Sequence, residues 1–138
     1  MLDKPSLKLS TALWQTIIEH LQKELPNEAC GLLGGVKGVV QQVYPVENEL
    51  RSPWAYRMAP KEQVRAMLEI EAAGWELSGI FHSHPNGPPG PSASDVAQAY
   101  YPEAVYLIFA PDARGEWQGR GFQIEEGRVE EIPVQVEE

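Results

Sequence analysis

The sequence predicts a mixed α/β fold in a single domain spanning residues 1–138, with one mixed β-sheet flanked by helices. Its length of 138 residues suits one domain that buries a hydrophobic core without disulfides. Helical and extended segments alternate along the chain, which is typical of a sheet with helices packed on its faces. One extended segment, residues 104–111, is apolar throughout and is predicted to be buried on both faces.

Two amphipathic segments predict the principal helices. In residues 11–25, apolar side chains recur at every fourth position, Ser10 is a suitable N-cap, and Pro26 ends the segment. Residues 59–74 show a similar apolar stripe, with a proline in the first turn and a glycine at the end. A third helix is expected to begin at Ser92.

Short apolar and β-branched segments predict the strands. Two of them pair through a glycine turn, and the last part of the chain forms a hairpin around Glu126 and Gly127, followed by a frayed acidic end. A short strand is also expected at 54–57. The other predicted strands lie within residues 29–35, 39–48, 76–84, 104–111 and 116–138.

Composition and cysteine usage narrow the class of function. The formal net charge of −9 repels phosphate backbones, so nucleic acid is not expected as a partner, whereas a basic partner would be attracted. Cys30 is the one cysteine, which rules out an intrachain disulfide and suits a reducing compartment. No apolar core of a secretory signal and no segment of membrane-helix length is found. A cytoplasmic protein with no membrane partner is therefore expected.

Two of the three histidines stand two positions apart near the end of a predicted strand. Because alternate strand residues point to one face, His82 and His84 can direct their nitrogens to one point, while Ser83 faces the other way. With Ser92 as N-cap, Asp95 is the third residue of the next helix, at its electropositive end. The proline- and glycine-rich loop before this helix offers a compact return path. Two histidines and an aspartate match a catalytic zinc site that keeps its fourth position open for water.

A zinc hydrolase also requires a general base near that water. Glu28 is the strongest candidate, because it stands at the edge of an apolar strand just after the proline that ends the first helix. Spacing alone does not establish that it meets His82, and a solvated loop carboxylate is the alternative.

These residues together resemble the signature of the JAMM or MPN+ metalloproteases in their small prokaryotic form. The order of the predicted elements agrees as well, so the resemblance covers nearly the whole chain. The match consists of Glu28 before Cys30-Gly31-Leu32-Leu33, then His82-Ser83-His84-Pro85, six residues, and Ser92-x-x-Asp95.

The resemblance implies a cytidine-deaminase-like fold, with a curved mixed sheet between helices. It implies that His82, His84 and Asp95 ligate Zn²⁺. It also implies that Glu28 takes a proton from the zinc-bound water and returns it to the leaving amine, while Ser92 donates a hydrogen bond to the oxyanion. Family members hydrolyse the bond after the C-terminal glycine of ubiquitin-like proteins. The partner implied is therefore a ubiquitin-like or sulfur-carrier protein with a C-terminal Gly-Gly tail.

Several alternatives stay open at the level of sequence. Cys30 could act as a thiol nucleophile, although a small buried strand residue is favoured. Ser92 could serve only as a helix cap. Trp54 and Tyr56 are candidates to line a groove for the substrate tail, with core packing as the alternative. His20 is expected on a helix surface.

Two other classes of function compete with a zinc peptidase. The domain could be a catalytically silent module that binds a ubiquitin-like protein, but it retains every position of the signature. A zinc deaminase would need further cysteine ligands, which a chain with one cysteine lacks. The sequence leaves the oligomeric state open, and a homodimer is compatible with it.

Overall fold

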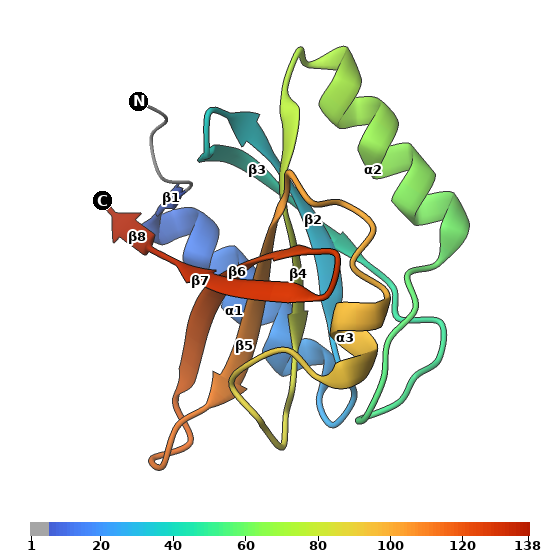
Figure 1. Ribbon diagram of the computed structural model, residues 1–138, viewed down its shortest axis with the longest axis vertical. Helices are drawn as coiled ribbons and strands as arrows, with labels where there is room; N and C mark the ends of the chain where they lie inside the picture. Colours follow the sequence, from blue (N-terminus) through green and yellow to red (C-terminus); the bar gives the residue numbers. More distant parts are fainter. Residues whose placement is uncertain (1–5) are drawn as a thin grey trace.

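One β-sheet of eight strands forms the framework of the molecule, in the order β7-β6-β5-β4-β2-β3-β1-β8 (Figure 1). The computed structural model describes residues 6–138 of the chain. The strands are β1 (Leu7–Ser10), β2 (Cys30–Val36), β3 (Val39–Val46), β4 (Glu76–Ser83), β5 (Val105–Pro111), β6 (Trp117–Glu125), β7 (Arg128–Ile132) and β8 (Val134–Glu137). The helices are α1 (Thr11–Glu24), α2 (Pro60–Ala72) and α3 (Ala93–Ala97).

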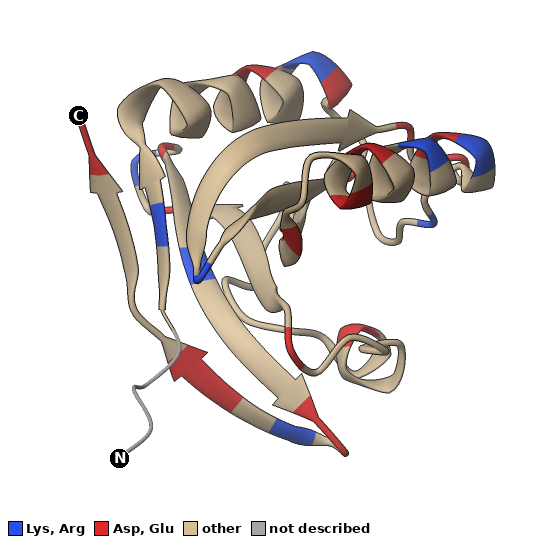
Figure 2. Cartoon of the chain, turned by 90° about the horizontal axis from the view of Figure 1, so that it is seen from above, with Lys and Arg blue, Asp and Glu red and all other residues tan. Residues whose placement is uncertain are grey.

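The sheet is mixed and strongly curved. β4 pairs in parallel with β5, and β1 pairs in parallel with both β3 and β8, whereas the other neighbouring strands run antiparallel. β7 and β8 stand at opposite ends of the strand order although Pro133 alone separates them in the chain, so the two ends of the sheet approach each other. The view from above shows this curvature (Figure 2). The mixed α/β class and the curved sheet flanked by helices are confirmed.

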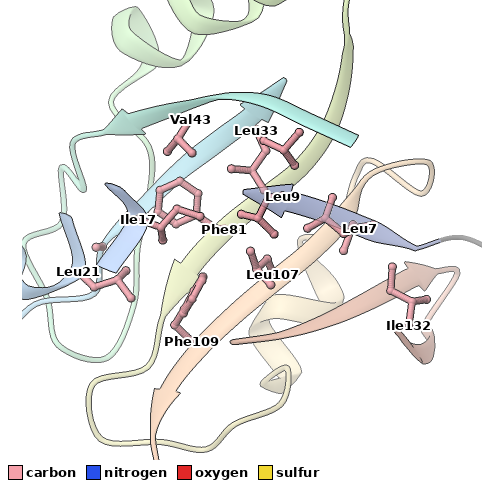
Figure 3. Close-up of a cluster of buried hydrophobic side chains, with 13 residues drawn as sticks. Leu7, Leu9, Ile17, Leu21, Leu33, Val43, Phe81, Leu107, Phe109 and Ile132 are labelled. Atoms are coloured by element: carbon pink, nitrogen blue, oxygen red, sulfur yellow. The ribbon is translucent and has the colours of Figure 1, made fainter. Parts of the chain in front are cut away.

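Helices cover both faces of the sheet through two hydrophobic clusters. On one face, Ile17 and Leu21 of α1 pack with strand residues that include Phe81 and Leu107 (Figure 3). On the other face, Ile70 of α2 belongs to a second cluster with residues of β2, β4 and β5. Because both faces are covered, β4 and β5 are buried over most of their length, as the apolar segment that forms β5 predicts.

The predicted ends of the main elements are confirmed. Ser10 caps α1, since its Oγ accepts a hydrogen bond from the N–H of Leu13 at 3.1 Å. Pro60 begins α2. Glu126 and Gly127 form the turn of the last hairpin with φ angles of 49° and 79°, which suit a two-residue hairpin loop.

One strand is missed by the sequence analysis and two local predictions are wrong. The missed strand is β1 (Leu7–Ser10), in which Leu7 and Leu9 alternate with Lys8 and Ser10 over too short a segment to stand out. The acidic end is not frayed, because Val134–Glu137 forms β8 and pairs with β1 residue by residue. The segment 54–57 contains no strand, and a single bridge between Asn48 and Met58 closes that loop instead. β8 is mostly exposed and its partner lies at the other end of the chain, so it lacks the buried face by which a strand is recognised.

Acidic residues are distributed over the helices and the C-terminal strands, and the basic residues are scattered among them along the part of the chain that the structure describes (Figure 2). None of the helices within residues 6–138 is long and apolar enough to span a membrane. The predicted domain extent of 1–138 and the expected lack of a secretory signal both involve residues 1–5, which lie outside the described residues. Both therefore stay predictions.

Candidate metal centre

Two histidines stand at the end of β4, in the middle of the sheet. His82 lies opposite Cys30 of β2 and Ile108 of β5, and it is 1 % exposed. His84 follows the strand, and its N–H donates to the carbonyl of Phe109 at 2.7 Å. The neighbouring strands on both sides therefore fix the backbone that carries these two imidazoles.

The donor atoms of His82, His84 and Asp95 converge on one point. The two Nε2 atoms lie 3.1 Å apart, and Oδ2 of Asp95 lies 3.2 Å from His82 Nε2 and 3.1 Å from His84 Nε2. Ligands about 2.1 Å from a tetrahedral zinc ion stand about 3.4 Å from one another. The three atoms are thus spaced like one face of a tetrahedron around such an ion, and this donor set fits zinc.

The start of α3 orients the carboxylate of Asp95. Ser92 Oγ accepts a hydrogen bond from the N–H of Asp95 at 3.0 Å, and the N–H of Ser92 donates to Asp95 Oδ2 at 2.8 Å. This capping box confirms Ser92 as the N-cap and Asp95 as the third helical residue. The same Oδ2 contacts both histidines, so the cap fixes the carboxylate where it meets them.

Burial and charge act in opposite directions within this cluster. Burial opposes ionisation of Asp95, but hydrogen bonds from His82 and His84 outweigh it and hold the pKa of that carboxyl well below its usual range. Burial lowers the pKa of His82. Burial acts the same way on His84, yet its hydrogen bonds to Asp95 and to the carbonyl of Pro88 leave its pKa raised. An ionised carboxylate is the form in which an aspartate binds a metal.

The loop between β4 and α3 sets the orientation of one imidazole. His84 Nδ1 lies 2.7 Å from the carbonyl oxygen of Pro88. A carbonyl can only accept, so Nδ1 carries the hydrogen, and in the neutral ring Nε2 keeps the lone pair that a metal needs. His82 Nδ1, in contrast, is buried without a hydrogen-bond partner among residues 6–138.

Glu28 lies beside the histidines without touching them. Its side chain is 4 % exposed, and a carboxylate oxygen lies within 4.8 Å of a ring nitrogen of each histidine. In the described part of the chain it forms no ion pair with His82 or His84, whereas Asp95 pairs with both. Burial raises the pKa of Glu28 to about 7, with a smaller lowering effect of His84 and a raising effect of Asp95. This carboxyl therefore stands off from the donor atoms at a pKa suited to proton transfer near neutral pH.

The two aromatic candidates differ in position. The ring of Tyr56 stacks on the imidazole of His82, with centroids 4.6 Å apart. Trp54 is 72 % exposed and makes no such contact. A cavity of about 260 Å³ lies next to Tyr56, and four of the side chains that line it are tyrosines. These are Tyr56, Tyr100, Tyr101 and Tyr106.

Cys30, the first residue of β2, contacts His20 of α1 through its backbone carbonyl. Cys30 is fully buried, and its Sγ lies 3.5 Å from the carbonyl oxygen of Val46. Burial is the main cause that raises the pKa of its thiol to about 12, and nearby carboxylates add to it. A thiolate nucleophile is therefore disfavoured, and the interpretation as a buried strand residue is confirmed. His20, expected on a helix surface, is half-buried: its Nε2 lies 3.1 Å from the carbonyl oxygen of Cys30, and burial lowers its pKa.

Two polar residues next to the site carry no role in the sequence interpretation. Ser83, between the histidines, is fully buried, and its Oγ accepts a hydrogen bond from the N–H of Ala29 at 2.9 Å. Asn48 is 3 % exposed and its amide donates to the carbonyl of Glu28 at 3.0 Å. Their partners are 54 and 20 residues away in sequence, so no local pattern indicates these contacts.

A curved mixed sheet whose central strand ends in two histidines, met by a capping aspartate and a buried glutamate, is the arrangement of a JAMM-type metalloprotease. The family model described as prokaryotic homologs of the JAB domain matches residues 10–122. The chain belongs to this family.

Similarity to known proteins extends along most of the chain. It is 37 % identical over 127 residues to the desampylase of Haloferax volcanii, covering 85 % of this chain and 91 % of that protein. It is 32 % identical over 134 residues to the CysO-cysteine peptidase of Mycobacterium tuberculosis, covering 96 % and 92 % of the two chains. A solution structure of a Desulfitobacterium hafniense protein superposes with a TM-score of 0.85 at 35 % identity, covering 96 % of this chain and 93 % of that one.

Proposed function

We propose that the chain is a zinc-dependent peptidase or isopeptidase that hydrolyses the bond after the C-terminal glycine of a ubiquitin-like or sulfur-carrier protein. The observation that carries the proposal is the convergence of the donor atoms of His82, His84 and Asp95 within 3.1 to 3.2 Å of one another, beside a buried glutamate. Relatives named as a desampylase and as a CysO-cysteine peptidase give the class of substrate.

His82, His84 and Asp95 would hold the metal through Nε2, Nε2 and Oδ2. When bound, the ion supplies Lewis acidity, which makes water a stronger acid and polarises a carbonyl group. The capping box and the Pro88 carbonyl support this role, because they fix two of the donors before any ligand arrives. Donors fixed in this way lose little conformational entropy on binding.

Glu28 would act as the general base and then as the general acid. It would take the proton from the attacking water and deliver it to the amine that leaves when the amide bond breaks. Its raised pKa of about 7 supports both steps, because the group can gain and lose a proton near neutral pH. Its carboxylate oxygen lies within 4.8 Å of a ring nitrogen of each histidine, which supports a role beside a water that the metal would hold.

Ser92 would donate a hydrogen bond to the oxyanion that develops on the scissile carbonyl. The capping bond does not compete with this role, because the Oγ acts there as acceptor and its hydrogen stays available for donation. Tyr56 and Trp54 would border the path of the substrate tail. An extended Gly-Gly tail offers backbone hydrogen bonds and little bulk, which suits addition beside a sheet edge.

The two rival functions have less support. A hydrolase that uses Cys30 would need a thiolate, and burial opposes it at this position. A silent binding module would not need a buried glutamate with a raised pKa beside an open donor set, since burying that carboxyl costs stability. We further infer a cytoplasmic location from the single, unpaired and buried cysteine.

The test compares the wild-type protein with Glu28→Gln, each with its zinc content measured, on two probes. One probe is CysO carrying a C-terminal cysteine, and the other is a ubiquitin-like carrier joined through Gly-Gly to a protein lysine. We expect zinc in both proteins, cleavage of at least one probe by the wild type, and loss of turnover in Glu28→Gln by about a hundredfold or more. A chelator should abolish the activity. Equal turnover by both proteins would rule out the base assignment, and cleavage that survives chelation would rule out the metal.

A further inference from the structure

Asn48 uses the complete hydrogen-bonding capacity of its side-chain amide. Nδ2 donates to the carbonyl oxygens of Glu28 and Ala55, both at 3.0 Å. Oδ1 accepts from the N–H groups of Leu50 and Arg57, both at 3.1 Å. Carbonyls accept and N–H groups donate, so these four partners also fix which way the amide is turned. A buried asparagine with four satisfied bonds is held in one orientation.

The backbone around Glu28 is held from two sides. On the side of the loop between β3 and α2, the N–H of Glu28 donates to the carbonyl of Ser52 at 2.8 Å, and its carbonyl accepts from Asn48. On the side of β4, Ser83 Oγ accepts from the N–H of Ala29, and the N–H of Ser83 donates to the carbonyl of Ala29 at 3.0 Å. Figure 1 shows this loop running from β3 back past the start of β2. The segment that carries Glu28 is thus fixed between a loop and the strand that carries the histidines.

We propose that Asn48 is a positioning residue for Glu28, a role that rests on the proposed function. The carboxylate of Glu28 has no ion-pair partner among residues 6–138, so its place beside His82 and His84 depends on the backbone from which it extends. Asn48 is the side chain that ties this backbone to the loop. Its second donor binds the carbonyl of Ala55, directly before Tyr56, so the same amide also holds the residue that stacks on His82.

This role has a physical consequence for turnover. A general base must stand within hydrogen-bond reach of the proton that it accepts, and a displacement of about 1 Å can cost about a hundredfold in rate. The proposed metal donors lie on β4, directly after it and on α3, and Asn48 forms no hydrogen bond with these segments among residues 6–138. At saturating zinc, loss of the Asn48 bonds should therefore slow the proton-transfer step while the metal stays bound.

Asn48→Asp is the sharpest variant. It keeps the oxygen that accepts from Leu50 and Arg57 and so keeps the loop closed, but it replaces the donor with a carboxylate oxygen that faces two carbonyls. Glu49→Gln is the control at the adjacent position: it makes the reverse exchange, of a carboxylate for an amide, and among residues 6–138 its side chain pairs with Arg57. We expect kcat to fall tenfold to about a hundredfold in Asn48→Asp with KM and zinc content near wild type, and no such fall in Glu49→Gln.

A double variant distinguishes a positioning role of Asn48 from general damage to the fold. In Glu28→Gln, the base that Asn48 would position is already absent. Adding Asn48→Asp to Glu28→Gln should therefore lower the residual turnover little further. An equal fractional loss in both backgrounds, or wild-type kcat in Asn48→Asp, would overturn the proposal.

Amide hydrogen exchange gives a readout that does not depend on any substrate. In the zinc-loaded protein, we expect the Glu28 amide to exchange about tenfold faster in Asn48→Asp than in Glu49→Gln, with the amides of β4 unchanged. An unchanged Glu28 amide would show that Asn48 does not hold this segment. If the wild type cleaves neither probe, the proposed function fails, while the exchange measurement still decides whether Asn48 fixes Glu28.

Discussion

The ring of Tyr56 stacks on the imidazole of His82, with centroids 4.6 Å apart and an angle of 28° between the planes. Tyr56 belongs to the loop between β3 and α2, whereas His82 belongs to the central strand of the sheet. The stack therefore covers one proposed metal donor with a residue from the segment that also holds the backbone of Glu28. Through it, the loop contacts the candidate metal centre directly.

Replacement of Tyr56 tests whether its stacking on His82 supports metal binding. Tyr56→Ala exposes the imidazole of His82 to water and removes a stacked pair worth about 0.5–1.5 kcal/mol beyond its buried area. We expect zinc affinity to fall about tenfold or more, as for other groups that orient a ligand histidine, and Tyr56→Phe to stay near wild type. Competition with a chromophoric chelator measures the affinity. Trp54→Ala, in the same loop but exposed, is the control, and a similar loss there would contradict a specific role of the stack.

Glu28 should make the stability of the metal-free protein depend on pH. Its pKa is about 7 in the folded chain, compared with about 4.3 for an ordinary glutamate. Between these values the folded state binds more protons than the unfolded state, so the contribution of Glu28 to stability falls as pH rises through this window. Gln at this position does not titrate. With chelator present, Glu28→Gln should therefore gain stability over the wild type from pH 5 to pH 8.

Thermal unfolding at several pH values measures this difference. The difference between the unfolding temperatures of the two proteins should be smallest near pH 4 and should grow up to about pH 8, with the variant rising relative to the wild type. Parallel curves would mean that the carboxyl is not desolvated in the folded state.

Gly31 occupies a point in β2 that admits no side chain. A Cβ at this position would lie 2.5 Å from the carbonyl oxygen of Tyr44 and would overlap the ring of Phe81. Both neighbours are fixed, one as strand backbone and one as a fully buried ring. Gly31→Ala should thus destabilise the fold by about 1–3 kcal/mol, the usual cost of overpacking. Gly90→Ala is the control, since its Cβ would meet no atom closer than 3.9 Å. Denaturant unfolding measures both, and equal stabilities would contradict the clash.

The convergence of His82, His84 and Asp95 could be predicted from the sequence because each of these residues depends on local geometry. His82 and His84 share a face through the period of a strand, and Asp95 follows from the cap at Ser92. The loop that joins them is short enough for its composition to indicate a compact return. These features are set by neighbouring residues, so they can be recognised without knowledge of the sheet topology.

The features that the sequence does not predict depend on contacts between distant segments. The pairing of β1 with β8 joins the two ends of the chain, and the short alternation of Leu7 and Leu9 does not indicate which distant strand is its partner. Asn48 resembles an ordinary loop residue, because its role lies in a bond to a carbonyl 20 residues earlier. His20 has the spacing of a surface position, yet the packing of α1 on the sheet half-buries it against the carbonyl oxygen of Cys30. Local periodicity contains no information on any of these contacts.

Ser92 has two roles that substitutions can separate. Its Oγ accepts the capping bond from the N–H of Asp95, and its hydrogen is available to an oxyanion. Alanine removes both, with about 1 kcal/mol for the lost cap, whereas glycine at an N-cap costs only a few tenths of that amount. Loss of an oxyanion donor lowers kcat by about 10²–10³-fold. If Ser92 acts in catalysis, Ser92→Ala and Ser92→Gly should therefore lose kcat to a similar extent, although their stabilities differ.

Ser92→Thr completes the series, because threonine keeps both the acceptor and the donor. It should retain most of the wild-type kcat and bind zinc normally. The measurements are kcat on the cleaved probe, zinc content and the midpoint of unfolding for all three variants. A glycine variant with wild-type kcat would show that the hydroxyl serves only as a cap that places the carboxylate of Asp95. A loss of kcat that follows the loss of stability across the series would lead to the same conclusion.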